Sequence, residues 1–230
     1  DVATGLHHHD GLDARRGRAA GGVGDGLWFA LNVSAIELAQ GDAYVAQLRD
    51  AGFHVARTID LSPWEARGEF LEGTGSLVLD RCHRIAYACR SPRTTALALA
   101  DFAGRLGYRA VAFDALGPDG RPAYHTNVLM AIGERFAVIC DEAIPDPGER
   151  ATVLRELREA GHEPISISVA EMHGFAGNLL ALCASDGGQV IVMSDTAWRS
   201  LAPATRTALE HHGRIVKLMG DGAIVEFASV

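Results

Sequence analysis

The sequence predicts an α/β fold assembled from a repeated strand–strand–helix–strand (ββαβ) unit of about fifty residues. The first observation is a glycine that ends each of four amphipathic segments. Gly52, Gly107, Gly161 and Gly213 recur at intervals of 55, 54 and 52 residues, and an apolar segment follows each one. Glycine commonly ends a helix because it adopts a left-handed backbone without steric cost. The period therefore predicts four helix-to-strand junctions with a left-handed glycine.

A second repeated pattern precedes the helices and predicts the other two strands of each unit. The segments EGTGSLVLD, HTNVLMAIG and AGNLLALCA begin at residues 72, 125 and 176, and a further apolar stretch follows each of them. Short apolar runs bounded by glycine and polar residues are typical of strands. We therefore expect second strands at residues 85–89, 136–140 and 190–193.

Two dipeptides indicate where the helices begin. Ser91–Pro92 and Asp146–Pro147 each place a capping side chain before a proline, which suits the first position of a helix. Apolar residues at helical spacing then define the face that each helix should bury. These residues are Leu99, Phe102 and Leu106 in the second helix, and Leu154, Leu157 and Ala160 in the third.

These signals divide the chain into three segments. Complete units are expected at about 70–120, 121–170 and 174–220, and the helix–strand half of an earlier unit at about 42–60. The repeated domain therefore covers residues 42–220. Residues 1–41 form an atypical glycine-rich segment that we expect to be disordered or disrupted, and residues 221–230 form a short C-terminal tail.

Composition excludes several classes of function. Hydrophobic residues make up 48% of the chain and charged residues 22%, which is typical of a globular protein. A net charge of −8 argues against a nucleic-acid binder, and no apolar run is long enough for a membrane span. Four cysteines without a CxxC pair make a zinc site unexpected and favour a cytoplasmic location. Association into a homo-oligomer stays open.

A carboxylate and a histidine occupy nearly equivalent positions in adjacent units. Glu72 lies in FLEGTGS and His125 in YHTNV, each just before an expected strand. Taken singly, such a glutamate is usually an idle surface residue and such a histidine is usually structural. Together they are more informative, because a carboxylate beside an imidazole fixes its tautomer for general acid–base chemistry.

Arg93 and Asn127 are candidates for ligand binding. Arg93 would lie in the first turn of the second helix, where it either extends into solvent or faces an anion such as an amino-acid carboxylate. Asn127, two residues after His125, would point to the same face of a strand. Its amide suits a neutral ureido group, although an asparagine can also simply stabilise a turn.

The segments that carry these residues resemble a known superfamily. FLEGTGSLVLD, SPRT, YHTNVLMAIGERFAVIC and FAGNLLAL occur in the order seen in the amidinotransferase/arginine-deiminase (pentein) superfamily, nearest to arginine-deiminase-related citrulline hydrolases. The resemblance covers about residues 42–215. It implies a pentein-type five-bladed α/β-propeller, of which this chain would hold about three and a half blades. It also implies hydrolysis of a C–N bond in a guanidino or ureido amino acid, with no metal and no cofactor.

The resemblance also assigns roles to the four candidate residues. His125 would be the acid/base, oriented by Glu72, and Arg93 would hold the carboxylate of the substrate. Arginine deiminases have aspartate at the position of Asn127, so asparagine there favours citrulline over arginine.

Two departures from the family pattern qualify the expected activity. The family's nucleophile is a cysteine in a glycine-rich C-terminal segment, whereas this chain continues as KLMGDGAIVEFASV and has no cysteine after Cys183. We therefore expect a hydrolase-type scaffold that is inactive, because this sequence lacks the cysteine nucleophile. Residues 1–41 also lack the early substrate-binding segment of the family. The alternatives are a non-catalytic pentein that acts as a binding or assembly module and, more weakly, an unrelated metallohydrolase that uses the ten histidines.

Overall fold

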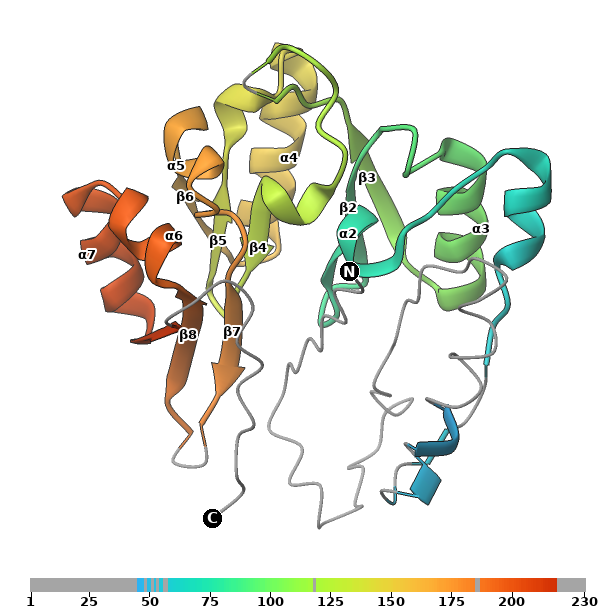
Figure 1. The fold of residues 1–230 in the computed structure, drawn as a ribbon, viewed down its shortest axis with the longest axis horizontal. Coiled ribbons are helices and arrows are strands. Elements are labelled where there is room, and N and C mark those ends of the chain that lie inside the picture. The colour runs from blue at the N-terminus through green and yellow to red at the C-terminus, as the bar shows by residue number, and fades with distance from the viewer. Residues whose placement is uncertain are drawn as a thin grey trace.

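The computed structural model describes residues 45–47, 49–50, 52, 54–55, 58–117, 119–184 and 187–218. Three ββαβ units follow one another across the molecule, from green through yellow to red in Figure 1. Within the described residues each unit has its own three-stranded sheet, with orders β1-β2-β3, β4-β5-β6 and β7-β8-β9. The predicted succession of ββαβ units is confirmed for these three.

The same topology recurs in every unit. The first two strands are antiparallel, and the third returns parallel to the second after a helical crossover. The first unit contains β1 (Val78–Asp80), β2 (Ile85–Cys89), α3 (Ala96–Leu106) and β3 (Arg109–Phe113). The second contains β4 (Met130–Ile132), β5 (Phe136–Ile139), α4 (Pro147–Glu159) and β6 (Glu163–Ser166). The third contains β7 (Leu180–Cys183), β8 (Gln189–Ser194), α6 (Asp195–Ser200), α7 (Pro203–His212) and β9 (Arg214–Leu218).

Short helical turns connect the units and precede their first strands. These are η1 (Ser62–Arg67), α2 (Gly73–Ser76), η2 (Thr126–Val128), η3 (Asp141–Ala143) and α5 (Val169–His173). The half-unit predicted at 42–60 falls in part on residues outside the described set, as do all of residues 1–41 and 221–230.

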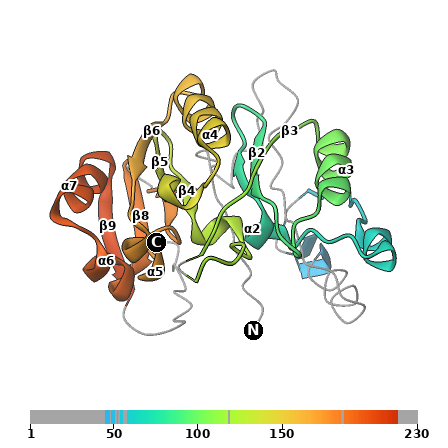
Figure 2. The same cartoon turned by 90° about the horizontal axis from the view of Figure 1, so that it is seen from above.

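The first strands of successive units lie next to one another. β1 contacts β4, and β4 contacts β7. Figure 2 shows the crossover helices α3, α4 and α7 on the outer side of their sheets. The approach to each first strand therefore lies on the inner side, where residues from adjacent units can meet.

Strand β2 shows how the sequence pattern builds the core. All five residues are buried, yet the two faces differ in side-chain size. Ile85, Tyr87 and Cys89 pack into the core shared with the second unit, whereas Ala86 and Ala88 face the cluster around α3. Alternate residues of a strand point to opposite faces, so small residues on the helix side let α3 approach the sheet.

Two predictions about helix ends are wrong. Ser91–Pro92 does not start a helix, because residues 91–94 form a turn closed by hydrogen bonds between Ser91 and Thr94, and α3 begins only after Thr95. Gly213 is extended, with φ −177°, unlike the left-handed Gly52, Gly107 and Gly161. Glycine is needed at 213 for space instead, since a Cβ there would lie 2.8 Å from the carbonyl oxygen of Gln189.

Other local predictions are confirmed. Asp146 caps α4 by accepting a hydrogen bond from the backbone N–H of Glu149, and Pro147 is the first residue of the helix. Leu99 and Phe102 of α3 are buried, as is Leu157 of α4. Within the part of the chain that the structure describes, no helix has the length and apolarity needed to span a membrane.

Candidate active site

Glu72 and His125 come from adjacent units and meet directly. Glu72 occupies the residue before α2, and His125 the residue before η2. Nε2 of His125 lies 2.6 Å from Oε2 of Glu72, and the side chains of His125 and Glu72 are 20% and 19% exposed. An ionised Glu72 can only accept, so His125 donates from Nε2, and a neutral ring then carries its lone pair on Nδ1.

Gly75 makes this approach sterically feasible. A Cβ at Gly75 would lie 2.7 Å from Nε2 of His125, closer than side-chain atoms tolerate. The glycine of the EGTGS segment therefore leaves the space into which the imidazole of the next unit fits. The structure thus gives a spatial reason for a small residue between Glu72 and β1.

Arg93 contacts the same carboxylate oxygen as His125. Its NH1 lies 3.2 Å from Oε2 of Glu72, while its side chain is about half exposed. Arg93 belongs to the 91–94 turn, so the expectation that it lies in the first turn of a helix is wrong. The carboxylate of Glu72 therefore lies between an imidazole and a guanidinium.

A buried set of hydroxyl groups holds these loops together. The hydroxyl of Ser76 donates to the backbone carbonyl of Arg93 at 2.8 Å and accepts from Thr94 at 2.7 Å and from the N–H of Glu72 at 2.8 Å. Thr126 donates to the carbonyl of Ser76 at 2.6 Å and accepts from the N–H of Cys89 at 2.8 Å. These bonds fix the backbones that carry all three site residues.

Tyr124 is a site residue that the sequence analysis missed. Its ring lies 4.8 Å from the ring of His125, and the guanidinium of Arg93 lies 5.5 Å from its centroid. The side chain is 52% exposed, so it covers the outer side of the two residues. No sequence signal distinguishes it except its place beside His125.

Asn127 does not share a strand face with His125, and that expectation is wrong. Residues 126–128 form the turn η2, because Thr126 turns inward to bind Ser76 and Cys89. Asn127 is half-buried, and its side chain forms no hydrogen bond with any residue that the structure describes. Its backbone position is close to His125, but its direction is set by a helical turn.

No disulfide joins any of the four cysteines, all of which the structure describes, and two of them are unsuited to nucleophilic chemistry. Burial raises the pKa of both Cys89 and Cys140 to about 11, which keeps these thiols protonated near neutral pH. Cys82 lies in the exposed β1–β2 turn, and Cys183 is exposed at the end of β7.

The three-unit architecture and the matched family motifs together define the class of protein to which this chain belongs. The protein is a member of the pentein amidinotransferase/deiminase superfamily, as the sequence motifs predicted. The family of eukaryotic N,N-dimethylarginine dimethylhydrolases matches residues 36–220, and the chain belongs to this family.

Comparison with solved structures supports the fold. The N-terminal domain of ArgZ, an arginine dihydrolase from the ornithine–ammonia cycle in cyanobacteria, superposes with a TM-score of 0.56 at 15% identity, over 81% of this chain and 61% of that domain. AgrE, solved with ornithine and NAD+, gives a TM-score of 0.59 at 15% identity, over 85% of this chain and 26% of AgrE. The chain thus spans about three-fifths of the ArgZ domain. No curated protein matches it.

Proposed function

We propose that this chain carries the acid–base and carboxylate-binding groups of a hydrolase site for a C–N bond in a guanidino or ureido amino acid. The observation that carries the proposal is the carboxylate of Glu72, which contacts Nε2 of His125 at 2.6 Å and NH1 of Arg93 at 3.2 Å. Membership of the dimethylarginine dimethylhydrolase family supports the guanidino class of substrate. Arginine dihydrolase is likewise the activity named for ArgZ.

Each group has a role that follows from its partner. Glu72 orients the ring of His125 and stabilises the imidazolium, so that Nδ1 can take and return a proton during C–N cleavage. Arg93 binds the α-carboxylate of the ligand. Because Arg93 contacts Glu72 in this structure, ligand binding exchanges one carboxylate for another at its guanidinium.

Covalent hydrolysis in this class requires a thiolate near the histidine. The sulfur attacks the central carbon and an amine or ammonia leaves with a proton from the histidine; water then releases a ureido product from a guanidino substrate, or a carbamate from a ureido substrate, and restores the thiol. The thiols of Cys89 and Cys140 are buried and protonated, whereas Cys82 lies in the exposed β1–β2 turn and Cys183 at the exposed end of β7. We therefore expect no turnover by the 230-residue chain itself.

A turnover assay tests that expectation. N,N-dimethylarginine, arginine and citrulline are each incubated with the chain, and release of amine or ammonia is measured. No product above buffer is expected. Turnover that a Cys-free variant retains would show that the mechanism is wrong, and turnover lost with a single cysteine would identify the nucleophile.

The amide of Asn127, half-buried and close in the chain to His125, is the basis on which we propose a preference for citrulline, although it does not share a strand face with His125. A ureido group offers a carbonyl acceptor and N–H donors, and an amide side chain can match both, whereas a guanidinium offers donors only. An unmatched polar contact in a desolvated site costs on the order of 1–3 kcal/mol, which corresponds to roughly ten- to hundred-fold in affinity. Citrulline should therefore bind more tightly than arginine, and Asn127→Asp should reverse the order.

Calorimetric titration of both ligands decides the preference. The wild-type chain and Asn127→Asp are compared, with Arg93→Gln as the variant expected to weaken both ligands alike. Tighter binding of arginine by the wild-type chain would refute the ureido assignment while leaving the guanidino class in place. Failure of every ligand to bind, including N,N-dimethylarginine, would refute the proposed site.

The finer architecture belongs to the same proposal. Residues 42–220 would form one repeated domain, and its units would be blades of the five-bladed propeller that the resemblance implies. Four cysteines without a disulfide among them suit a reducing cytoplasmic compartment. A structure of the chain bound to citrulline would test the domain boundaries and the contacts of Arg93 and Asn127 together.

A further inference from the structure

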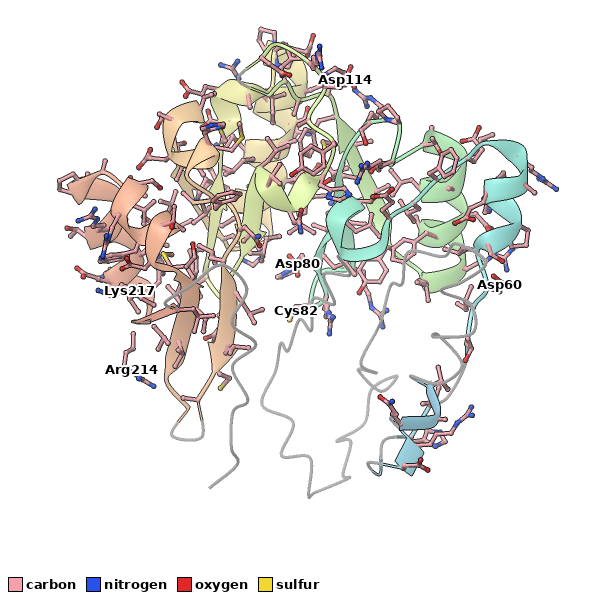
Figure 3. All side chains as sticks on the ribbon, viewed as in Figure 1. Asp60, Asp80, Cys82, Asp114, Arg214 and Lys217 are labelled. Atoms are coloured by element: carbon pink, nitrogen blue, oxygen red, sulfur yellow. The ribbon has the colours of Figure 1, made fainter. Side chains whose placement is uncertain are left out.

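A second carboxylate–histidine group joins the first and second units at the other end of β1. Asp80 is the last residue of β1, His83 lies in the β1–β2 turn, and His162 immediately precedes β6. Figure 3 labels Asp80, together with its neighbour Cys82, where the first strand ends. These three residues, called the Asp80 cluster below, have no part in the proposed hydrolase chemistry.

The potential ligand atoms of the Asp80 cluster converge. Oδ2 of Asp80 lies 2.8 Å from Nε2 of His162 and 2.8 Å from Nδ1 of His83. All three atoms lie within 4.8 Å of one another. The other oxygen of Asp80 accepts the backbone N–H of His83 at 3.0 Å, which fixes the carboxylate and leaves Oδ2 directed between the two imidazoles.

Burial makes the arrangement rigid on one side and open on the other. The side chains of Asp80 and His162 are 3% and 5% exposed, whereas that of His83 is 48% exposed. Two ligands are therefore held by the packed interface of the two units. The third lies at the surface, where an ion and a fourth ligand such as water can enter.

Two imidazoles and one carboxylate are a donor set suited to divalent transition metals, zinc among them. Metal–ligand bonds of about 2.0–2.2 Å in a tetrahedral site place the ligand atoms roughly 3.3 Å apart. Both hydrogen-bonded pairs, now at 2.8 Å, need a small separation to reach this geometry. The exposed ring of His83 can supply its part by rotation, whereas the buried pair of Asp80 and His162 requires a small shift of the carboxylate.

We propose that Asp80, His83 and His162 form a binding site for a divalent transition metal that joins the first unit to the second. Binding replaces the N–H groups that now point to Oδ2, so each neutral imidazole carries its proton on the other ring nitrogen. For His162 that atom is Nδ1, which is buried and has no hydrogen-bond partner. The unmatched N–H weakens binding roughly ten- to hundred-fold relative to a fully satisfied site.

The unmatched N–H of His162 determines how tightly the site should hold a metal ion. The site should bind Zn²⁺ and Co²⁺ in the micromolar range and release them to a chelator, without being required for folding. The proposal departs from the sequence-based expectation of no metal site, which considered only cysteine spacing and histidine runs. It is independent of the proposed function, because none of its ligands is Glu72, Arg93 or His125.

The test measures zinc binding by calorimetry and Co²⁺ binding by visible absorption. The chain contains His7, His8 and His9 in a row, and Cys82 lies beside His83, so these four residues could bind metal in their own right. A background with His7→Asn, His8→Asn, His9→Asn and Cys82→Ser therefore serves as the reference protein. The reference protein should bind one equivalent of Zn²⁺, and its Tm should rise when zinc is added.

His83→Asn in this background removes the exposed ligand without disturbing the core. It should weaken zinc at least ten-fold and abolish the zinc-dependent rise in Tm, whereas His173→Asn, at an exposed histidine on α5, should change neither. His83→Cys should restore binding and add a sulfur-to-cobalt charge-transfer band. The proposal is overturned if the reference protein binds no zinc at millimolar concentration, or if His83→Asn binds it as tightly as the reference does.

Discussion

Two carboxylate–histidine pairs connect the first unit to the second, and they differ in every respect except their chemistry. Glu72 precedes β1 and pairs with His125, whereas Asp80 ends β1 and pairs with His162. The first pair is about one-fifth exposed and the second is nearly inaccessible to solvent. The comparison teaches that the surroundings of such a pair, more than its members, determine what it can do.

The surroundings are distinct in kind. At the Glu72 site, defined as Glu72, Arg93 and His125, the pair is partly exposed, and the exposed side chains of Tyr124 and Arg93 lie beside it as groups that a ligand could contact. The Asp80 cluster is packed between a strand end and the α4–β6 junction. The first pair should therefore contribute to binding and catalysis, and the second to stability.

Removal of each carboxylate should give the largest contrast. Asp80→Ala leaves the buried N–H of His162 without its acceptor, and we expect a loss of about 3 kcal/mol in the free energy of unfolding. Glu72→Ala affects a partly solvated pair and should cost less than about 1 kcal/mol. Urea denaturation of both variants measures this difference, and equal losses would contradict the division between stability and chemistry.

The contribution of Asp80 to stability should also appear in how the free energy of unfolding depends on pH. Burial alone would raise the pKa of Asp80, but hydrogen bonds from His162 and His83 outweigh burial and hold this pKa below its ordinary value. A carboxyl whose pKa is lower in the folded state stabilises the fold above about pH 4, its unfolded value, and this stabilisation disappears as pH falls through the folded pKa.

Asp80→Asn should therefore flatten the decline of unfolding free energy below about pH 4. The measurement is a series of urea denaturation curves across that range, with Glu159→Gln as a matched change at an exposed carboxylate. A decline as steep in Asp80→Asn as in the wild-type chain would show that Asp80 is not the source of the acid sensitivity.

Gly75→Ala should disturb the Glu72 site from within. The new Cβ would overlap the ring of His125, so the ring must move away from Glu72 at a cost of about 1–2 kcal/mol. The signal of the His125 ring N–H in an NMR spectrum should shift or disappear. Gly104→Ala is the control, because a Cβ there meets nothing within 4 Å, and the variant should be unchanged or up to about 1 kcal/mol more stable.

Tyr124→Leu should have the smallest effect. An exposed cation–π contact contributes about 0.5–1 kcal/mol, so loss of the ring should weaken a carboxylate ligand of Arg93 by only a few-fold. Calorimetric titration with citrulline measures the change, and Leu97→Ala provides a control at another exposed apolar residue. A loss of a hundred-fold or more would assign Tyr124 a direct role in holding the ligand.

The sequence predicted the repeated elements well, because their signals are local. The second strand of the first unit was expected at residues 85–89 and is observed as Ile85–Cys89, since a continuous apolar run between polar turns has few alternatives. Asp146 before Pro147 likewise capped the helix that the pattern predicted. Position in the repeat also indicated that Glu72 and His125 could meet.

The errors arose where tertiary contacts override a local pattern. Ser91–Pro92 has the same residues that start a turn, and the bond from Thr94 to the buried Ser76 favours the turn over a helix. Thr126 points inward to Ser76, which makes η2 and removes Asn127 from the face assigned to it. Neither hydroxyl contact could be inferred from neighbouring residues.

The Asp80 cluster was beyond sequence reasoning for a different cause. Asp80 and His162 are 82 residues apart and belong to different positions of their repeats, so neither spacing nor period brings them together. Only the parallel return of β6 beside β5 places His162 at the end of β1.

The two pairs also constrain how the first and second units can move relative to each other. A single point of attachment allows one body to pivot about it. Two contacts, one at each end of the segment that contains α2 and the three residues of β1, restrict rotation of one unit relative to the other. The buried bond from Thr126 to Ser76 and the core shared by the two units hold them at further points, so a ligand that loosens Glu72 from His125 changes the site without freeing the second unit to rotate.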